Sequence, residues 1–221
     1  MIATISADIV RSTSLRTRDL IQLRKRLLRL FGELERDIPG FWARIIKGDG
    51  IECFIPDHRY VLRIAVLLKL FVKMQADKCE CSAMLQRHGI RFSIGIGEIN
   101  YVNKKEDIID GPAIYISGRN LDDIGRRHDT FSLVEVDGAP QYINCMLDSY
   151  VAMISNLIDS YSAKQAEVVY FKILGLKERE ISKRLKIFQS SVNTRSTNAQ
   201  WGLLNTAIKD FENVDFEKIC G

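Results

Sequence analysis

Apolar positions in the first 136 residues follow the two-residue period of strands and the longer period of helices in turn. The β-branched run at residues 1–9 predicts a buried strand. Two apolar stretches at residues 41–47 and 51–55 flank the turn "GDG" and predict a β-hairpin. Residues 89–99 and 131–136 predict two further strands, and the glycines of the former suit close packing against its backbone.

Segments with helical spacing separate these strands. A helix is expected to begin near Thr17 or Asp19 and to end at "DIPG". Its apolar face is formed by Leu20, Leu23, Leu27, Leu30, Phe31 and Leu34. Residues 56–75 and 111–127 predict two more helices, the second with a proline in its first turn, and a polar loop is expected over 100–110. The order β-α-β-β-α-β-α-β predicts an α/β sandwich over a partly antiparallel sheet.

Beyond residue 136 the pattern is helical throughout, with a long helix over 140–161 and three shorter helical signals after it, the last over 188–211. We therefore predict an α+β protein. Its parts are a ferredoxin-like α/β domain over residues 1–138, a connecting helix over 139–160 and an all-α domain over 161–221.

The composition is that of an ordinary globular protein. The 221 residues are 46% hydrophobic and 27% charged, and no stretch approaches the roughly 20 apolar residues that span a membrane. The N-terminal residues lack the basic and apolar regions of a signal peptide. Five cysteines, an odd number at irregular spacing, favour reduced thiols over a disulfide framework or a zinc site. We therefore expect a cytoplasmic protein without a membrane anchor.

Positive charge is concentrated near the C-terminus. The chain has 32 Lys and Arg against 28 Asp and Glu, a formal charge of +4. Residues 161–213 contain nine of the basic and five of the acidic residues, so this segment carries the whole excess. An anionic partner such as nucleic acid is therefore expected at this segment.

Residues 174–199 have the pattern of a helix-turn-helix. Ile181 and Leu185 would form the inner face of the first helix, and Val192 of the second helix would point back to the core. The short polar side chains of the second helix would then face outward, where they could contact base edges in the major groove. The candidate DNA-binding residues are Lys183, Arg184, Lys186, Ser190, Ser191, Asn193, Thr194, Arg195, Thr197 and Asn198, of which the basic ones suit phosphates.

The run "EREISKRLKIFQSSVNTR" resembles the helix-turn-helix of LuxR-type regulators and of sigma-factor region four. This resemblance implies binding to double-stranded DNA. LuxR-type domains usually carry a lysine after the buried valine, where this chain has Asn193, so no base preference is carried over. The alternative is a three-helix bundle for protein contact, which would be favoured if residues 191–199 were buried against the first domain.

Two aspartates and an arginine of the first domain form a second candidate site. Asp8 ends the first predicted strand, Asp49 lies in the hairpin turn, and Arg119 lies in the helix over 111–127. A two-metal phosphoryl-transfer site needs carboxylates on two neighbouring backbone elements and an arginine that stabilises the transferring phosphate. Asp8 and Asp49 meet if the first strand lies beside the hairpin. Alternatively, each aspartate only suits a strand end or a turn.

Residues around the aspartates are candidates for contact with a nucleotide. The backbone N–H groups of "VRSTS" could cradle phosphates. The candidate nucleotide-binding residues are Ser12, Thr13, Lys47 and Gly48. The histidines, His58, His88 and His128, are scattered and are expected to be surface or rim residues.

The segments "ADIVRST", "KGDGIECF", "IRFSIGIGEI" and "DGPAIYISGRNLD" recur in this order in class III nucleotidyl cyclases, which the first domain resembles. The resemblance implies a cyclase-like sandwich, with Asp8 and Asp49 as ligands of Mg²⁺ or Mn²⁺ and Arg119 as the transition-state residue. Two positions depart from the family. Tyr115 stands in place of an asparagine, and Ile45 in place of the lysine that reads adenine. As an enzyme, the chain would be a class III-like cyclase in which Tyr115 does the asparagine's work.

The order of segments along nearly the whole chain resembles the SatD family of bacterial proteins, from "ADIVRS" to "YSAKQAEVVYFKILGLKEREISKRL". This resemblance implies a cyclase-like domain joined to a helix-turn-helix. We expect a DNA-binding transcriptional regulator rather than an enzyme, whose first domain binds a nucleotide or phosphorylated ligand as a sensor. Both halves imply a homodimer, because class III sites form across two subunits and helix-turn-helix proteins read paired half-sites. The alternatives are a metal-dependent nucleotidyl cyclase with a helix-turn-helix targeting module, and an interaction protein with a vestigial site.

Overall fold

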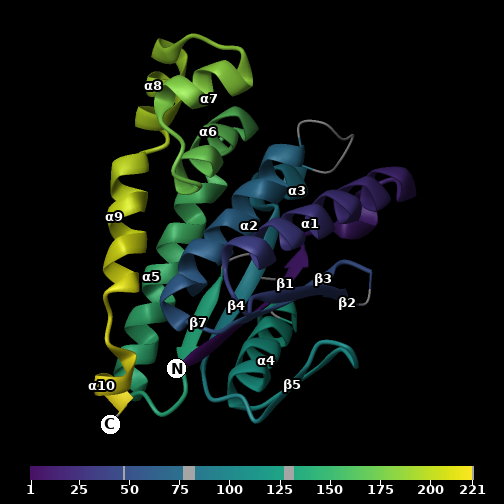
Figure 1. Cartoon of the computed structure of the whole chain (residues 1–221), viewed down its shortest axis with the longest axis vertical. Coiled ribbons are helices and arrows are strands. Elements are labelled where there is room, and N and C mark those ends of the chain that lie inside the picture. The colour runs from purple at the N-terminus through teal and green to yellow at the C-terminus, as the bar shows by residue number, and fades with distance from the viewer. Residues whose placement is uncertain (47, 77–82, 127–131, 221) are drawn as a thin grey trace.

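The computed structural model describes residues 1–46, 48–76, 83–126 and 132–220 (Figure 1). Lys47 and His128 lie outside the described residues, as do Cys79 and Cys81. The N-terminal part is a mixed five-stranded sheet with helices, and the C-terminal part is mostly helical, which confirms the predicted α+β class. Within the residues described, none of the helices has the length and apolar character needed to cross a membrane.

The main sheet places the first strand at its centre. Its strands are β1 Ile2–Ile9, β2 Trp42–Ile46, β3 Gly50–Ile55, β4 Ile90–Gly97 and β7 Leu133–Val136. Their order across the sheet is β2-β3-β1-β4-β7. β1 is antiparallel to both β3 and β4, whereas β4 and β7 are parallel. The predicted hairpin is β2–β3, and it lies beside β1.

The two faces of β1 differ in chemistry, because alternate side chains of a strand point to opposite faces. One face carries Ala3, Ile5, Ala7 and Ile9, and the other carries Thr4, Ser6 and Asp8. Helices α1 (Thr17–Asp37) and α2 (Val61–Ala76) lie on one side of the sheet and α4 (Pro112–Arg126) on the other, as Figure 1 shows. The polar face is the one that meets α4.

Helix α4 approaches the sheet unusually closely. The hydroxyl oxygen of Ser117 lies 3.0 Å from that of Thr4 and 2.9 Å from that of Ser6, and all three residues are buried. A Cβ atom at Gly95 of β4 would lie only 2.1 Å from the carbonyl oxygen of Ala113. The glycine is therefore required by contact with α4, as the sequence predicted for this strand.

Helix α5 (Gln141–Asp159) covers the outer edge of β7. Asp148 Oδ1 accepts the backbone N–H of Val134 at 2.8 Å, and Asn144 Oδ1 accepts that of Val136 at 2.9 Å. Asn144 Nδ2 also donates to the carbonyl of Val136 at 3.2 Å. These side chains satisfy backbone groups that an edge strand would otherwise leave open to pairing with another chain.

The helices that follow α5 pack back onto the first part of the chain. They are α6 Ala163–Ile173, α7 Glu178–Leu185, α8 Gln189–Asn198, α9 Trp201–Glu212 and α10 Phe216–Cys220. Both α6 and α9 contact α2, and the ring of Phe216 lies edge-on to that of His58 at 5.6 Å. His58 is therefore largely buried, and it lines an open cavity rather than lying freely on the surface.

One cluster of buried apolar side chains extends from Ala3 in β1 to Phe216 in α10. The N-terminal and C-terminal parts thus share a core through α2. The predicted domain bounds at residues 138 and 160 remain a prediction, because a shared core neither requires nor forbids separate units.

Two segments differ in detail from the predicted elements. Residues 100–110, expected to be a loop, contain the ribbon β5 (Tyr101–Asn103) and β6 (Ile108–Asp110). Asn103 Oδ1 accepts the N–H groups of Lys105 and Glu106, which closes the turn between these strands. The helix expected over 188–211 is divided into α8 and α9, because Gln200 adopts a left-handed backbone with φ of 50°.

Three short helices complete the chain. They are η1 Ser12–Ser14, η2 His58–Tyr60 and α3 Ala83–His88. The first follows β1 directly, and the third ends just before β4.

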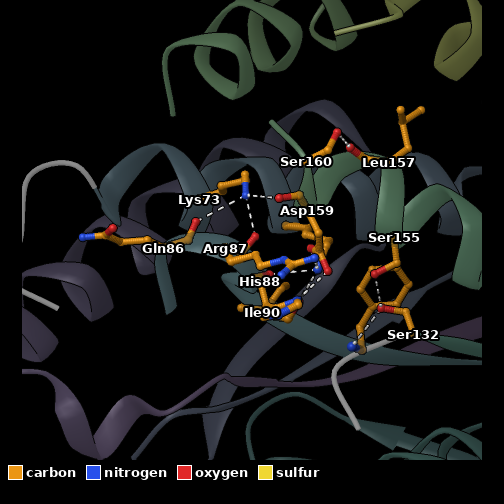
Figure 2. A network of polar contacts seen from close by, with 12 residues as sticks. Lys73, Gln86, Arg87, His88, Ile90, Ser132, Ser155, Leu157, Asp159 and Ser160 are labelled. Carbon is orange, nitrogen blue, oxygen red and sulfur yellow. Dashed lines mark hydrogen bonds and ion pairs between the residues drawn. The ribbon is translucent and has the colours of Figure 1, made fainter. Parts of the chain in front are cut away.

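Two lysines of α2, Lys69 and Lys73, are buried beneath the ends of α3 and α5, and Figure 2 shows Lys73 beside Asp159. Lys69 Nζ donates to the carbonyl of His88 at 2.8 Å and lies 2.8 Å from Asp159 Oδ1. Lys73 Nζ donates to the carbonyl of Asp159 at 3.1 Å and to two carbonyls of α3. His88 Nδ1 lies 2.6 Å from Asp159 Oδ2. His88 is therefore largely buried beneath α5, although it still lines an open cavity beside Asn156.

Candidate functional site

The turn between β2 and β3 lies beside the end of β1. Asp8 faces the first residue of β3 across the antiparallel ladder, so Asp49 lies next to it at the same end of the sheet. The hydroxyl of Ser12 donates to Asp49 Oδ2 at 2.5 Å, and Arg24 of α1 donates to the carbonyl of Gly48 at 2.9 Å. The structure thus brings four predicted residues together, and we call Asp8, Ser12, Gly48 and Asp49 the aspartate corner.

The backbone after β1 turns sharply at the aspartate corner. Arg11 adopts a left-handed conformation with φ of 55°, and η1 follows it. The N–H of Val10 donates to the carbonyl of Gly89, and that of Ser14 donates to the carbonyl of Arg11. The predicted phosphate cradle is therefore partly engaged within the protein, which leaves the backbone around the exposed Thr13 as its candidate portion.

Arg91 is the residue of this region that the sequence did not single out. It lies opposite Asp8 in the β1–β4 ladder, and its Nε and Nη2 atoms contact the two carboxylate oxygens of Asp8, each at 2.7 Å. The side chains of Arg91 and Asp8 are 20% and 27% exposed. A bidentate pair of this kind is strong and directional. Only the register of β1 against β4 could have revealed it, because 83 residues separate the partners.

A pair of divalent ions does not fit the aspartate corner as it is arranged. Both oxygens of Asp8 are bound by Arg91, and one oxygen of Asp49 is bound by Ser12. Mg²⁺ would have to lie about 2.1 Å from a carboxylate oxygen. At an effective dielectric of about 20, a divalent ion about 4 Å from a guanidinium would meet a repulsion of roughly 8 kcal/mol. No group of three His, Cys, Asp or Glu able to hold a metal occurs among the described residues.

The predicted catalytic residues lie on the exposed face of α4. The Tyr115 side chain is exposed, and its hydroxyl donates to Asp110 Oδ1 at the end of β6. This bond to a carboxylate raises the pKa of Tyr115. Arg119 is also exposed, and its Nε donates to the carbonyl of Tyr115 at 3.2 Å. Together with Ile114 and Gly118, these two residues line an open cavity of about 430 Å³.

Tyr115 and Arg119 are not joined to the aspartate corner within one chain. Among the described residues, no hydrogen bond or ion pair connects either side chain to Asp8 or Asp49. Ile45, at the position of the family's adenine-reading lysine, packs against the core and offers a base no polar contact.

The second predicted site, on α7 and α8, is held as a compact pair of helices. Helix α7 ends at Leu185, Lys186 turns the backbone with φ of 54°, and α8 begins at Gln189. The hydroxyl of Ser182 donates to the carbonyl of Ile187 at 2.6 Å, which stabilises this turn. Val192 and Ile181 are fully buried, as the pattern predicted for the inner face.

Most of the candidate DNA-binding residues are exposed. They are Lys183, Arg184, Lys186, Ser190, Asn193, Thr194, Thr197 and Asn198, whereas Ser191 and Arg195 are partly buried. Helix α8 contacts α6, α7 and α9 rather than the sheet. Of the run 191–199, only Val192, Ser196 and Ala199 are buried. The polar face of α8 is thus not covered by the first part of the chain.

Three of these candidates have partners within the C-terminal part. Lys172 pairs with the carboxylate of Glu178 at 2.9 Å and holds the pKa of Glu178 below its usual value, and Asn193 contributes to the same shift. The Thr194 hydroxyl donates to the carbonyl one turn earlier at 3.0 Å. Arg184 lies 4.9 Å above the ring of Phe171. Among the described residues, the exposed candidates without such partners are Ser190, Thr197 and Asn198 on α8, together with Lys183 of α7 and Lys186 of the turn.

Comparison with models of protein families, with curated proteins and with solved structures finds no match to this chain. Its function must therefore be inferred from its own residues and their arrangement.

Proposed function

We propose that this protein is a DNA-binding transcriptional regulator whose α/β part senses a nucleotide or another phosphorylated ligand. In this proposal α7 and α8 form a helix-turn-helix, and the sheet with its helices is a ferredoxin-like, cyclase-like sandwich of the kind found in SatD proteins. The observation that carries the proposal is the uncovered polar face of α8, flanked by exposed lysines at 183 and 186. A bundle built only to pack against the first part would bury that face.

Helix α8 is the recognition helix in this proposal. The short side chains of Ser190, Thr197 and Asn198 can approach base edges when the helix lies in the major groove. Lys183 and Lys186 lie at the end of α7 and in the turn, where they suit the phosphate backbone. The local excess of positive charge is modest, so a homodimer that reads two half-sites is proposed to supply sufficient affinity.

The junction between the two parts offers a route for a signal. Asp159 ends α5 close to the start of α6, and its side chain and carbonyl are bound by Lys69 and Lys73 of α2. A ligand that changes the position of α2 would therefore change the base of the α6–α8 unit. Such a ligand regulates only through different affinities for two arrangements of the protein.

Binding of a random-sequence DNA duplex, followed by fluorescence anisotropy over a range of salt concentrations, tests the DNA-binding part. The logarithm of the affinity should fall linearly with the logarithm of the salt concentration. Lys183→Ala should weaken binding to all sequences and reduce the slope by about 1. Arg29→Ala, which removes an exposed charge from α1, is the matched control and should change neither. Absence of salt-dependent binding would favour an interaction protein instead.

The sensing part is tested by titrating the protein with ATP, GTP, CTP and UTP. A nucleotide that binds should change the affinity for DNA, and DNA should change the affinity for that nucleotide by the same factor. Asp49→Asn should change the affinity for the nucleotide without changing DNA binding by the free protein, because it alters the charge and the Ser12 contact of the corner. A metal-dependent cyclase remains the alternative function, and its site would require Arg91 to release Asp8. Formation of a cyclic product that depends on Asp49 would establish that alternative.

A further inference from the structure

We propose that the aspartate corner receives its phosphorylated ligand without a divalent metal ion, because Arg91 occupies both carboxylate oxygens of Asp8, where a metal would have to bind. This inference rests on the proposed function for the identity of the ligand. Its first part, that Asp8 is committed to Arg91 and does not bind metal, stands on the geometry alone.

Arg91 holds the carboxylate of Asp8 in a fixed arrangement. The two residues face each other across neighbouring strands, and two nitrogen–oxygen contacts of 2.7 Å join them. A planar guanidinium matches a carboxylate in this way, whereas an ammonium group would not. Both strands are interior to the sheet, so the β1–β4 ladder fixes the backbone positions of the two residues opposite each other.

Helix α4 confines the guanidinium on its other side. A Cβ atom at Gly125 of α4 would lie 3.4 Å from Arg91 Nη2, which is ordinary van der Waals contact, so the guanidinium lies against α4 at this glycine. Arg91 is therefore a positioned side chain between β4 and α4, and only 20% of it is exposed.

The carboxylate of Asp8 is neutralised without metal. Arg91 pairs with both of its oxygens, and Asp49 Oδ2 accepts the hydroxyl of Ser12. A site of two uncompensated carboxylates would repel phosphate unless metal ions lay between them. With Asp8 paired to Arg91, a phosphate can approach the exposed backbone around Thr13 directly.

Binding of Mn²⁺ to the full-length protein, measured by electron paramagnetic resonance of the free ion, tests the first part. The wild-type protein should bind no Mn²⁺ at the corner in the absence of nucleotide. Arg91→Gln frees Asp8 and should raise the affinity for Mn²⁺ by about tenfold or more. Adding Asp8→Asn to that variant should abolish the gain. Stoichiometric binding by the wild-type protein that is lost in Asp8→Asn would overturn the proposal.

A variant that keeps the positive charge at position 91 provides a second measurement in case Arg91→Gln does not fold. Arg91→Lys should still bind no Mn²⁺, because an ammonium group near Asp8 repels the ion as the guanidinium does. Mn²⁺ binding by a correctly folded Arg91→Lys protein with the strength of the Gln variant would contradict the role given to charge. Circular dichroism confirms the fold in each case.

The second part is tested with the nucleoside triphosphates as probes, in EDTA and in Mg²⁺. The dissociation constant should differ by less than about threefold between the two conditions. Binding that requires Mg²⁺ would overturn metal-independence. If no probe binds in either condition, the sensing function fails, while the Mn²⁺ measurement still decides whether Arg91 occupies the place of a metal.

Discussion

The ammonium group of Lys69 in α2 lies 2.8 Å from a carboxylate oxygen of Asp159, the last residue of α5, and both side chains are buried. The contact is an ion pair, and two backbone carbonyls, those of His88 and Ile90, complete the surroundings of the lysine. Burial lowers the pKa of Lys69, and the charge of Asp159 opposes that effect. The pair fastens the helical C-terminal part to the helix layer of the sheet.

Asp159→Asn should destabilise the protein by roughly 3 kcal/mol or more, because it leaves the ammonium of Lys69 buried without an opposite charge. Urea denaturation followed by circular dichroism measures the change. Replacing Lys69 with Met in the same chain should recover part of the loss. The exposed pair of Arg59 with Asp57 provides the control, and Arg59→Ala should change the stability little. Equal effects of the buried and exposed substitutions would show that the buried pair is not the connection described.

Gly95→Ala should destabilise the protein by about 3 kcal/mol or more, because the new methyl group would overlap the Ala113 carbonyl of α4. Gly32→Ala in α1 is the matched control, since nothing lies within 4 Å of its Cβ position. That change should instead stabilise the helix by about 1 kcal/mol. Thermal unfolding of both variants shows whether each substitution lowers or raises the stability. A neutral Gly95→Ala would contradict the close approach of α4 to β4.

Asp148 should make the protein less stable as the pH rises through the pKa of its carboxyl group. Burial raises that pKa, the N–H of Val134 partly opposes the shift, and the charge of Glu135 adds to it. A carboxyl whose pKa is higher in the folded state binds its proton more readily there. Its contribution is therefore fully present below the unfolded value of about 3.9 and is lost above the raised one.

Asp148→Asn should flatten this part of the pH profile, because the amide oxygen can still accept the N–H of Val134 but cannot ionise. Asp57 provides a control of opposite sign, since its bond to Arg59 lowers its pKa. Its contribution is lost as the pH falls. Urea midpoints measured at a series of pH values separate the two. A steeper profile for Asp148→Asn than for the wild-type protein would refute the assignment.

Cys53 should resist alkylation in the folded protein, because its thiol is completely buried in β3 and burial raises its pKa, with the charge of Glu52 adding to the shift. The thiolate is the reactive form. Of the cysteines that the structure describes, Cys145 on α5 is the exposed one and should react with iodoacetamide before Cys53. Peptide mass spectrometry at increasing urea concentration distinguishes the two sites. Labelling of Cys53 at the rate of Cys145 in native buffer would mean that the sheet opens readily at β3.

Local periodicity was sufficient to predict the regular elements. The helix expected from Thr17 to "DIPG" is α1, and the hairpin around "GDG" is β2–β3. Elements that depend on turn chemistry were less accessible. The ribbon over residues 100–110 is closed by an asparagine side chain, and the break at Gln200 is a single left-handed residue. Neither feature produces a periodic pattern of apolar residues, so the sequence pattern did not predict them.

The sequence by itself determined which residues are apolar on one side of each element, and hence the α+β class, the buried faces and the polar face of α8. These properties depend on neighbours three or four residues apart. Only the tertiary structure decided that Asp8 meets Arg91, that Asp49 meets Ser12, and that His88, Lys69 and Asp159 form one buried group. Such contacts follow from strand order, register and helix packing. Strand order and register can be seen only once distant segments of the chain are folded together. For this reason the sequence predicted Asp8 as a metal ligand, whereas the structure shows it bound to Arg91.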